Sequence, residues 1–163
     1  MMLRFTQIYR GDESPALAIT LSFDQRVKSR QKVVLENGSE AGLFLPRGTI
    51  LQQGDCLLAE TNEIVRIIAA SETVSTTYIS DPLIMARCSY HLGNRHVPLQ
   101  ITPEFIRYQH DHVLDEMLTG LGVTVTVESA PFEPEAGAYG SNSHTHGHSH
   151  EHDHGDGHHD HAH

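Results

Sequence analysis

Histidine is the residue type whose number and spacing in this chain point most directly to chemistry. The chain has 14 histidines, and ten of them lie between His144 and His163, where they mostly alternate with Gly, Ser, Thr, Asp and Glu. A neutral imidazole, the main form at pH 7 for an ordinary pKa of ~6.5, is a good ligand for nickel, zinc, copper and cobalt ions. The tail is therefore predicted to bind metal through His144, His146, His148, His150, His152, His154, His158, His159, His161 and His163.

Three histidines that precede the tail are further candidate ligands. His110 and His112 flank Asp111, and in an extended segment both rings would face one side, with Asp111 better suited to capping the helix that follows. His96 follows a Gly-Asn-Arg turn, which would leave its ring exposed. One exposed histidine holds an ion poorly, but a two-fold dimer would bring two copies together. The alternative for all three is an incidental surface histidine, which is the reading we prefer for His91.

Composition restricts the possible partners. The net charge is −10, and 11 of the 163 residues are Lys or Arg against 21 that are Asp or Glu, so the chain is not a basic nucleic-acid binder. Cys56 and Cys88 lack the paired spacing of a zinc or redox site. The start has no apolar leader, and no apolar run approaches the ~20 residues that a membrane span needs. We expect a cytoplasmic protein with no membrane or nucleic-acid partner.

The first half of the sequence must supply a scaffold, because nothing in it suggests catalysis. Short apolar runs alternate with turn residues at spacings near ten, which predicts a compact all-β domain over residues 1–72. The expected strands are 16–21, 32–35, 41–45 and 56–59. The segments 31–36 and 40–45, joined through Asn37 and Gly38, form the clearest predicted hairpin.

The second half alternates strand and helix signals, and it carries His96, His110 and His112. We expect strands at 63–70, 97–101, 104–108 and 123–127, with one helix from Asp81 to Gly93 and another from Asp111 to Gly120. Over 63–128 this gives β-α-β-β-α-β, the ferredoxin-like arrangement. The predicted fold class is α+β: the all-β domain, then a ferredoxin-like metal-binding domain at 73–140, of which 131–140 reads as a linker, and a disordered His-rich tail at 141–163.

Several separated motifs resemble the UreE family of urease accessory proteins. They are HLGNRH at 91–96, VPLQ at 97–100, YQHDHVL at 108–114 and PFEPEAGAY at 131–139, followed by a His-rich end. The resemblance covers essentially the whole chain. It implies a homodimeric nickel metallochaperone for urease maturation, with an N-terminal domain likened to a peptide-binding module and a metal-binding second domain.

The resemblance also implies a role for each histidine. His96 would meet its two-fold mate around one Ni²⁺, His110 and His112 would form an auxiliary pair, and the tail would collect nickel. The ion would pass to the GTPase UreG, within the assembly of urease apoprotein and accessory proteins. The protein itself would perform no covalent chemistry and would not be an enzyme.

Two other functions remain open on the sequence. The tail could make the protein a nickel or zinc store or buffer, with the folded part as its anchor. A metal-dependent hydrolase using His96, His110 and His112 would need a carboxylate base, for which only Glu104 and Asp111 are close in sequence. The identity of the ion is also open, because Cu²⁺ binds such ligands most tightly and Zn²⁺ competes as well.

Overall fold

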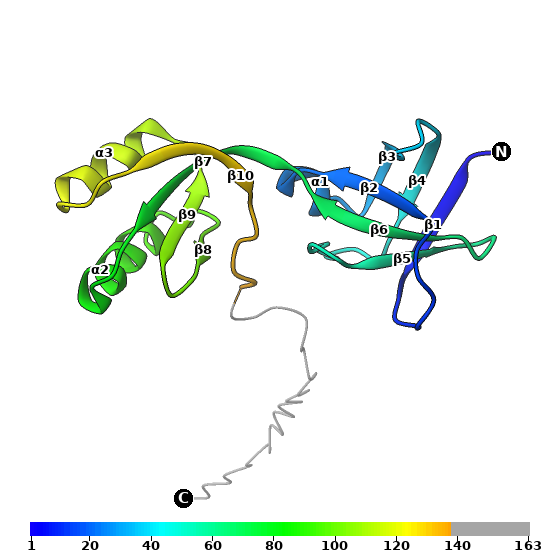
Figure 1. The fold of residues 1–163 in the computed structure, drawn as a ribbon, viewed down its shortest axis with the longest axis horizontal. Helices are drawn as coiled ribbons and strands as arrows, with labels where there is room; N and C mark the ends of the chain where they lie inside the picture. Colours follow the sequence, from blue (N-terminus) through cyan, green and yellow to red (C-terminus); the bar gives the residue numbers. More distant parts are fainter. Residues whose placement is uncertain (138–163) are drawn as a thin grey trace, which may run out of the picture.

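The first half of the chain folds around one mixed sheet in the computed structural model, which describes residues 1–137. Figure 1 shows two lobes, and the first holds a six-stranded sheet with strand order β2-β6-β5-β1-β4-β3. Its core is made of side chains such as Phe5, Ile19 and Leu57, all 0 % exposed. The elements are β1 (Leu3–Tyr9), β2 (Leu17–Leu21), α1 (Phe23–Arg26), β3 (Arg30–Val34), β4 (Glu40–Phe44), β5 (Cys56–Ala59) and β6 (Ile64–Ala69).

The predicted hairpin is confirmed. β3 and β4 pair antiparallel with Val34 opposite Glu40. Gly38, in the turn between them, has φ of 85°, a left-handed conformation that glycine adopts without steric cost. The short helix α1 was not predicted, although Ser22 and Gln25 form a capping box at its start.

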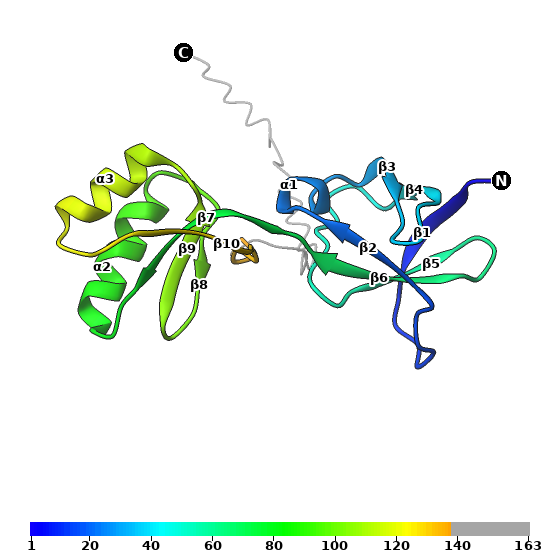
Figure 2. The same ribbon diagram turned by 45° about the horizontal axis from the view of Figure 1, so that its top comes forward.

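The second lobe is built on a four-stranded antiparallel sheet with strand order β10-β7-β9-β8. Both long helices pack against one face, because Cys88 and Leu92 of one and Leu114 and Leu118 of the other share a buried cluster with Ile106. Figure 2 shows α2 and α3 together on that side. The second lobe has the order β-α-β-β-α-β, in β7 (Ser71–Tyr78), α2 (Pro82–Gly93), β8 (Gln100–Ile101), β9 (Phe105–Gln109), α3 (His112–Gly120) and β10 (Thr126–Pro131), and the prediction is confirmed from α2 onward.

The first strand of this unit is not the one that the sequence predicted. The segment expected at 63–70 is β6, which pairs with β2 and β5 in the first sheet. The second sheet begins instead with β7, which runs between β10 and β9. β7 escaped prediction because its buried residues are mostly hydroxyl-bearing: Ser75, Thr76 and Thr77 are each 0 % exposed. A strand is predicted from alternating apolar and polar residues, and a central strand of buried polar side chains lacks that alternation.

Two further strands have different bounds from those predicted. β8 covers only Gln100–Ile101 of the expected 97–101, because Pro98 has no N–H to donate and the carbonyl of Leu99 accepts from the backbone N–H of Glu135 at 2.8 Å. The strand expected at 123–127 starts at Thr126, where pairing with Thr76 begins. The valines before it pack on the core without a strand partner.

The segment after β10 was expected to act as a linker, and the structure corrects this for its described part. Phe132 is 0 % exposed, and its ring lies edge-to-face with that of Phe23, 5.4 Å between centroids. The buried guanidinium of Arg26 donates to the carbonyl oxygens of Leu51 and Phe132. Residue 132, which follows the second sheet, is therefore fixed against the first lobe.

The predicted start of α2 is confirmed and gives a stability prediction. The Asp81 carboxylate accepts from the backbone N–H groups of Leu83 and Ile84 at 2.8 and 3.3 Å, and Pro82 occupies the first turn. We expect Asp81→Ala to lower the free energy of unfolding by about 1 kcal/mol, measured by urea denaturation. Asp81→Asn keeps an acceptor in the same place and should change it much less; equal losses in the two variants would contradict the capping role.

No helix within residues 1–137 is long and apolar enough to cross a bilayer.

Candidate metal centre

His96 is held at the surface by the turn that ends α2. The backbone N–H groups of Asn94, Arg95 and His96 donate to the carbonyls of Tyr90, Leu92 and Gly93, each at 3.0 Å. These bonds tighten the last turn of the helix and stop it at this point. His96 is exposed, as the turn predicts.

The backbone of His96 is also unusual. Its φ is 55°, in the left-handed region that side chains with a Cβ rarely adopt, and among described residues other than glycine only Asn62 shares a positive value. Such a conformation costs roughly 1 kcal/mol and persists only where the surroundings impose it. A strained exposed histidine is consistent with a functional position.

His110 and His112 lie where β9 passes into α3. The Asp111 carboxylate between them accepts from the backbone N–H groups of Val113 and Leu114 at 2.8 and 3.2 Å. The expectation that Asp111 caps the helix is confirmed. His112 is exposed in the first turn of α3, whereas the His110 ring is held by neighbouring side chains.

The His110 ring contacts two groups through the same nitrogen. Its Nδ1 lies 3.1 Å from Ser75 Oγ and 3.2 Å from Asp115 Oδ2. The hydroxyl of Tyr108 donates to the other oxygen of Asp115 at 2.5 Å. Burial raises the pKa of Tyr108, and the hydrogen bond to Asp115 raises it further, so the phenol stays protonated. A nucleophile relay needs serine and aspartate on opposite ring nitrogens, so this cluster is not a hydrolytic triad.

A pocket of about 250 Å³ is lined both by His110 and by the chain that follows His96. Its lining includes Val97, Pro98, His110 and Asp111. A hollow of about 390 Å³ beside Arg26 and Ile50 lies in the joint between the lobes, and none of the four histidines of the described part lines it. The side chains of His96, His110 and His112 are all exposed, so exchanging ligands can reach them.

Within residues 1–137, no three His, Cys, Asp or Glu side chains lie close enough together to hold one ion. Both His96 and the His110–His112 pair are therefore incomplete ligand sets in a single copy. His91 is exposed on α2, with its ring edge-to-face against Tyr90. The ten predicted tail ligands, from His144 to His163, lie outside the described residues.

Three residues around His110 were not predicted from the sequence, namely Ser75, Tyr108 and Asp115. Asp115 lies in the first turn of α3, and its position in the sequence is typical of an ordinary carboxylate on a helix surface. Only the bend between β9 and α3 brings it to His110, and only the sheet brings Ser75 there. Sequence spacing carries no signal for either contact.

Fold and site together define a two-domain α+β protein whose second domain presents exposed imidazoles. The UreE urease accessory protein family matches twice: its N-terminal domain over residues 5–70 and its C-terminal domain over residues 72–163. A curated protein from Proteus mirabilis, named urease accessory protein UreE, is 54 % identical to this chain over 149 residues. The match covers 86 % of this chain and 92 % of the relative. The protein of that name from Pseudomonas putida is 58 % identical over 135 residues, covering 81 % and 84 %. The chain belongs to the UreE family, and the resemblance read from the sequence is confirmed.

Proposed function

We propose that this protein is a nickel metallochaperone, which binds Ni²⁺ as a homodimer and donates it during assembly of the urease metallocentre. The observation that carries the proposal is the presentation of His96, strained and exposed, on a domain that belongs to the UreE family. The ion is cargo, and the protein itself carries out no covalent chemistry. This work would take place in the cytoplasm.

The central site in this proposal consists of two His96 rings from two copies of the chain. A single copy supplies an incomplete ligand set, and two-fold symmetry doubles every ligand that lies near the axis. The exposed apolar side chains of α2, the helix that leads into His96, support contact with a second copy. Leu83 is 58 % exposed and Tyr90 is 65 % exposed, and they lie seven residues apart on one helix face.

The remaining histidines have supporting roles in this proposal. His110 and His112 form an auxiliary site beside the segment that follows His96, and the tail histidines collect nickel. Imidazole ligands on an open surface exchange readily, so an ion can pass between overlapping ligand sets without being released to solvent. The recipients we propose are the GTPase UreG and the assembly of urease apoprotein and accessory proteins. Zn²⁺ and Cu²⁺ compete for the same nitrogens.

The alternative role of a nickel or zinc buffer rests on the composition of the tail. The two roles are separated by comparing the full chain with a chain that ends at residue 143. We expect equilibrium dialysis to show about one tightly bound Ni²⁺ per dimer in both, because the central site lies in the folded part. The shorter chain should lose only weaker sites and still support urease activation in a reconstituted system.

Loss of all nickel binding in the shorter chain, together with loss of urease activation, would establish buffering by the tail as the main role. Lowering the pH should release the ion from either chain, because protons and metal compete for the same lone pairs.

A further inference from the structure

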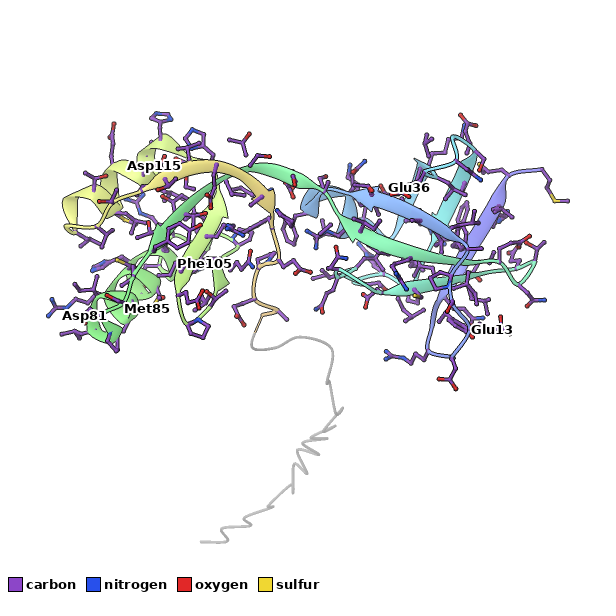
Figure 3. All side chains as sticks on the ribbon, viewed as in Figure 1. Glu13, Glu36, Asp81, Met85, Phe105 and Asp115 are labelled. Atoms are coloured by element: carbon purple, nitrogen blue, oxygen red, sulfur yellow. The ribbon has the colours of Figure 1, made fainter. Side chains whose placement is uncertain are left out.

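The His110 ring is surrounded by polar groups from three elements. Tyr108 on β9 donates to Asp115 Oδ1, and Asp115 on α3 faces His110 Nδ1 with its Oδ2. Ser75 on β7 lies against the same nitrogen, and it is 0 % exposed. Figure 3 marks Asp115 on α3. Ser75 and Asp115 therefore both contact the Nδ1 atom of the His110 ring.

These contacts select one tautomer of His110. The Ser75 hydroxyl can either donate to Nδ1 or accept from it, but an ionised carboxylate only accepts, so the approach of Asp115 Oδ2 to within 3.2 Å favours a proton on Nδ1. A neutral imidazole has one N–H, which leaves the lone pair on Nε2. Among the described residues no hydrogen bond or ion pair involves Nε2, and 39 % of the side chain is exposed. The free lone pair is therefore available to a metal ion.

The geometry of Asp115 is itself fixed. Its side chain is 18 % exposed, and the Tyr108 residue that anchors it is 1 % exposed. An exposed histidine and a carboxylate contribute little to stability as an ion pair, typically below about 1 kcal/mol. A buried phenol that orients a carboxylate toward an exposed ring instead resembles the outer-shell partner that metal-binding histidines use to fix ring orientation and tautomer.

We propose that Asp115 is a positioning residue for metal capture: it holds the Nδ1 proton of His110 and presents Nε2 to the ion. The inference rests on the proposed function, because it takes His110 as a ligand. It adds a residue with no metal contact of its own, whose effect is transmitted through the imidazole.

Asp115→Asn tests the inference, because it keeps the shape and changes the hydrogen bonding. The amide oxygen of the new asparagine will accept the hydrogen bond from the Tyr108 hydroxyl, which leaves its NH₂ group facing His110 Nδ1. That nitrogen must then accept, so the proton moves to Nε2 and blocks the ligand position. Long-range ¹H–¹⁵N NMR spectra of the full chain, with the His110 signals assigned through His110→Gln, report the tautomer without any metal.

Metal affinity at His110 is then followed through the same ring signals, with the free Zn²⁺ concentration fixed by a chelator so that binding by the tail does not alter it. We expect Asp115→Asn to shift the tautomer to Nε2–H and to weaken Zn²⁺ binding at His110 by roughly 10- to 100-fold. Glu116→Gln is the matched control, because it removes the same charge from the next, exposed position of α3. It should leave both the tautomer and the affinity unchanged.

The outcomes separate this inference from the function on which it rests. An unaltered His110 tautomer and equal Zn²⁺ affinity in Asp115→Asn would overturn the positioning role alone. A ring with a free Nε2 that shows no response to Zn²⁺ in the unmodified protein would overturn His110 as a ligand, and the inference with it. Equal weakening by Asp115→Asn and Glu116→Gln would reduce the effect to net charge and would also contradict the proposal.

Discussion

Replacing His96 by Ala is expected to abolish the tightest nickel site and most of the urease activation. In a dimer the substitution removes two ligands at once, so the loss exceeds the roughly 10- to 100-fold that a single outer-shell partner costs. Nickel binding is measured by equilibrium dialysis on the chain that ends at residue 143, which removes the background from the tail histidines. Activation is measured by reconstitution of urease.

Two variants control for effects on folding and on surface charge. His96→Asn also removes the imidazole, but asparagine adopts a positive φ more readily than most residues, so it should preserve the turn. His91→Ala removes an exposed histidine one turn of helix earlier and should leave the tight site intact. High-affinity nickel binding that survives in both His96 variants would contradict the central site.

Replacing Phe132 by Ala is expected to produce the largest loss of stability of the substitutions considered. Its ring is fully buried between the lobes against Phe23, and the backbone carbonyl of the same residue accepts from Arg26. Removal of a buried phenyl group costs about 3–5 kcal/mol through lost burial and the cavity that remains. Urea denaturation, followed by circular dichroism, measures the loss.

Ile50→Ala provides the comparison, because Ile50 borders the hollow at the same joint but is 51 % exposed. It should cost less than about 1 kcal/mol, since a half-exposed side chain loses little burial. Similar costs for both variants would show that Phe132 is not part of a cooperative core. That result would return the described part of the 131–140 segment to the role of a simple linker.

The fold could be predicted from the sequence wherever local signals and tertiary demands agree. Helix α2 begins at Pro82 and ends at Gly93, as its aspartate cap and its glycine indicate. The β3–β4 hairpin follows from the turn around Gly38. Prediction failed at β7, because a central strand with buried hydroxyl groups has no apolar pattern. The strand that precedes it in the chain, β6, does have an apolar pattern and was taken for the first strand of the second lobe.

The candidate site divides in the same way. Histidine type and spacing identified His96, His110 and His112 as candidates, and the exposure of His96 after its turn was predicted correctly. Their assignment as metal ligands stays a prediction, as does that of the tail histidines. The left-handed backbone of His96 could not be read from the sequence, because it depends on how α2 is joined to the next strand.

The sequence by itself determined the family, the order of helices and strands from α2 onward and the supply of imidazole ligands, because each depends on residue type and short-range spacing. Only the tertiary structure decided which sheet each strand joins, how residue 132 closes the joint between the lobes, and which carboxylate faces His110. Those features come from contacts between segments far apart in the chain, such as Ser75 with His110 and Arg26 with Phe132. Burial and hydrogen bonding select such contacts only once the whole chain has folded.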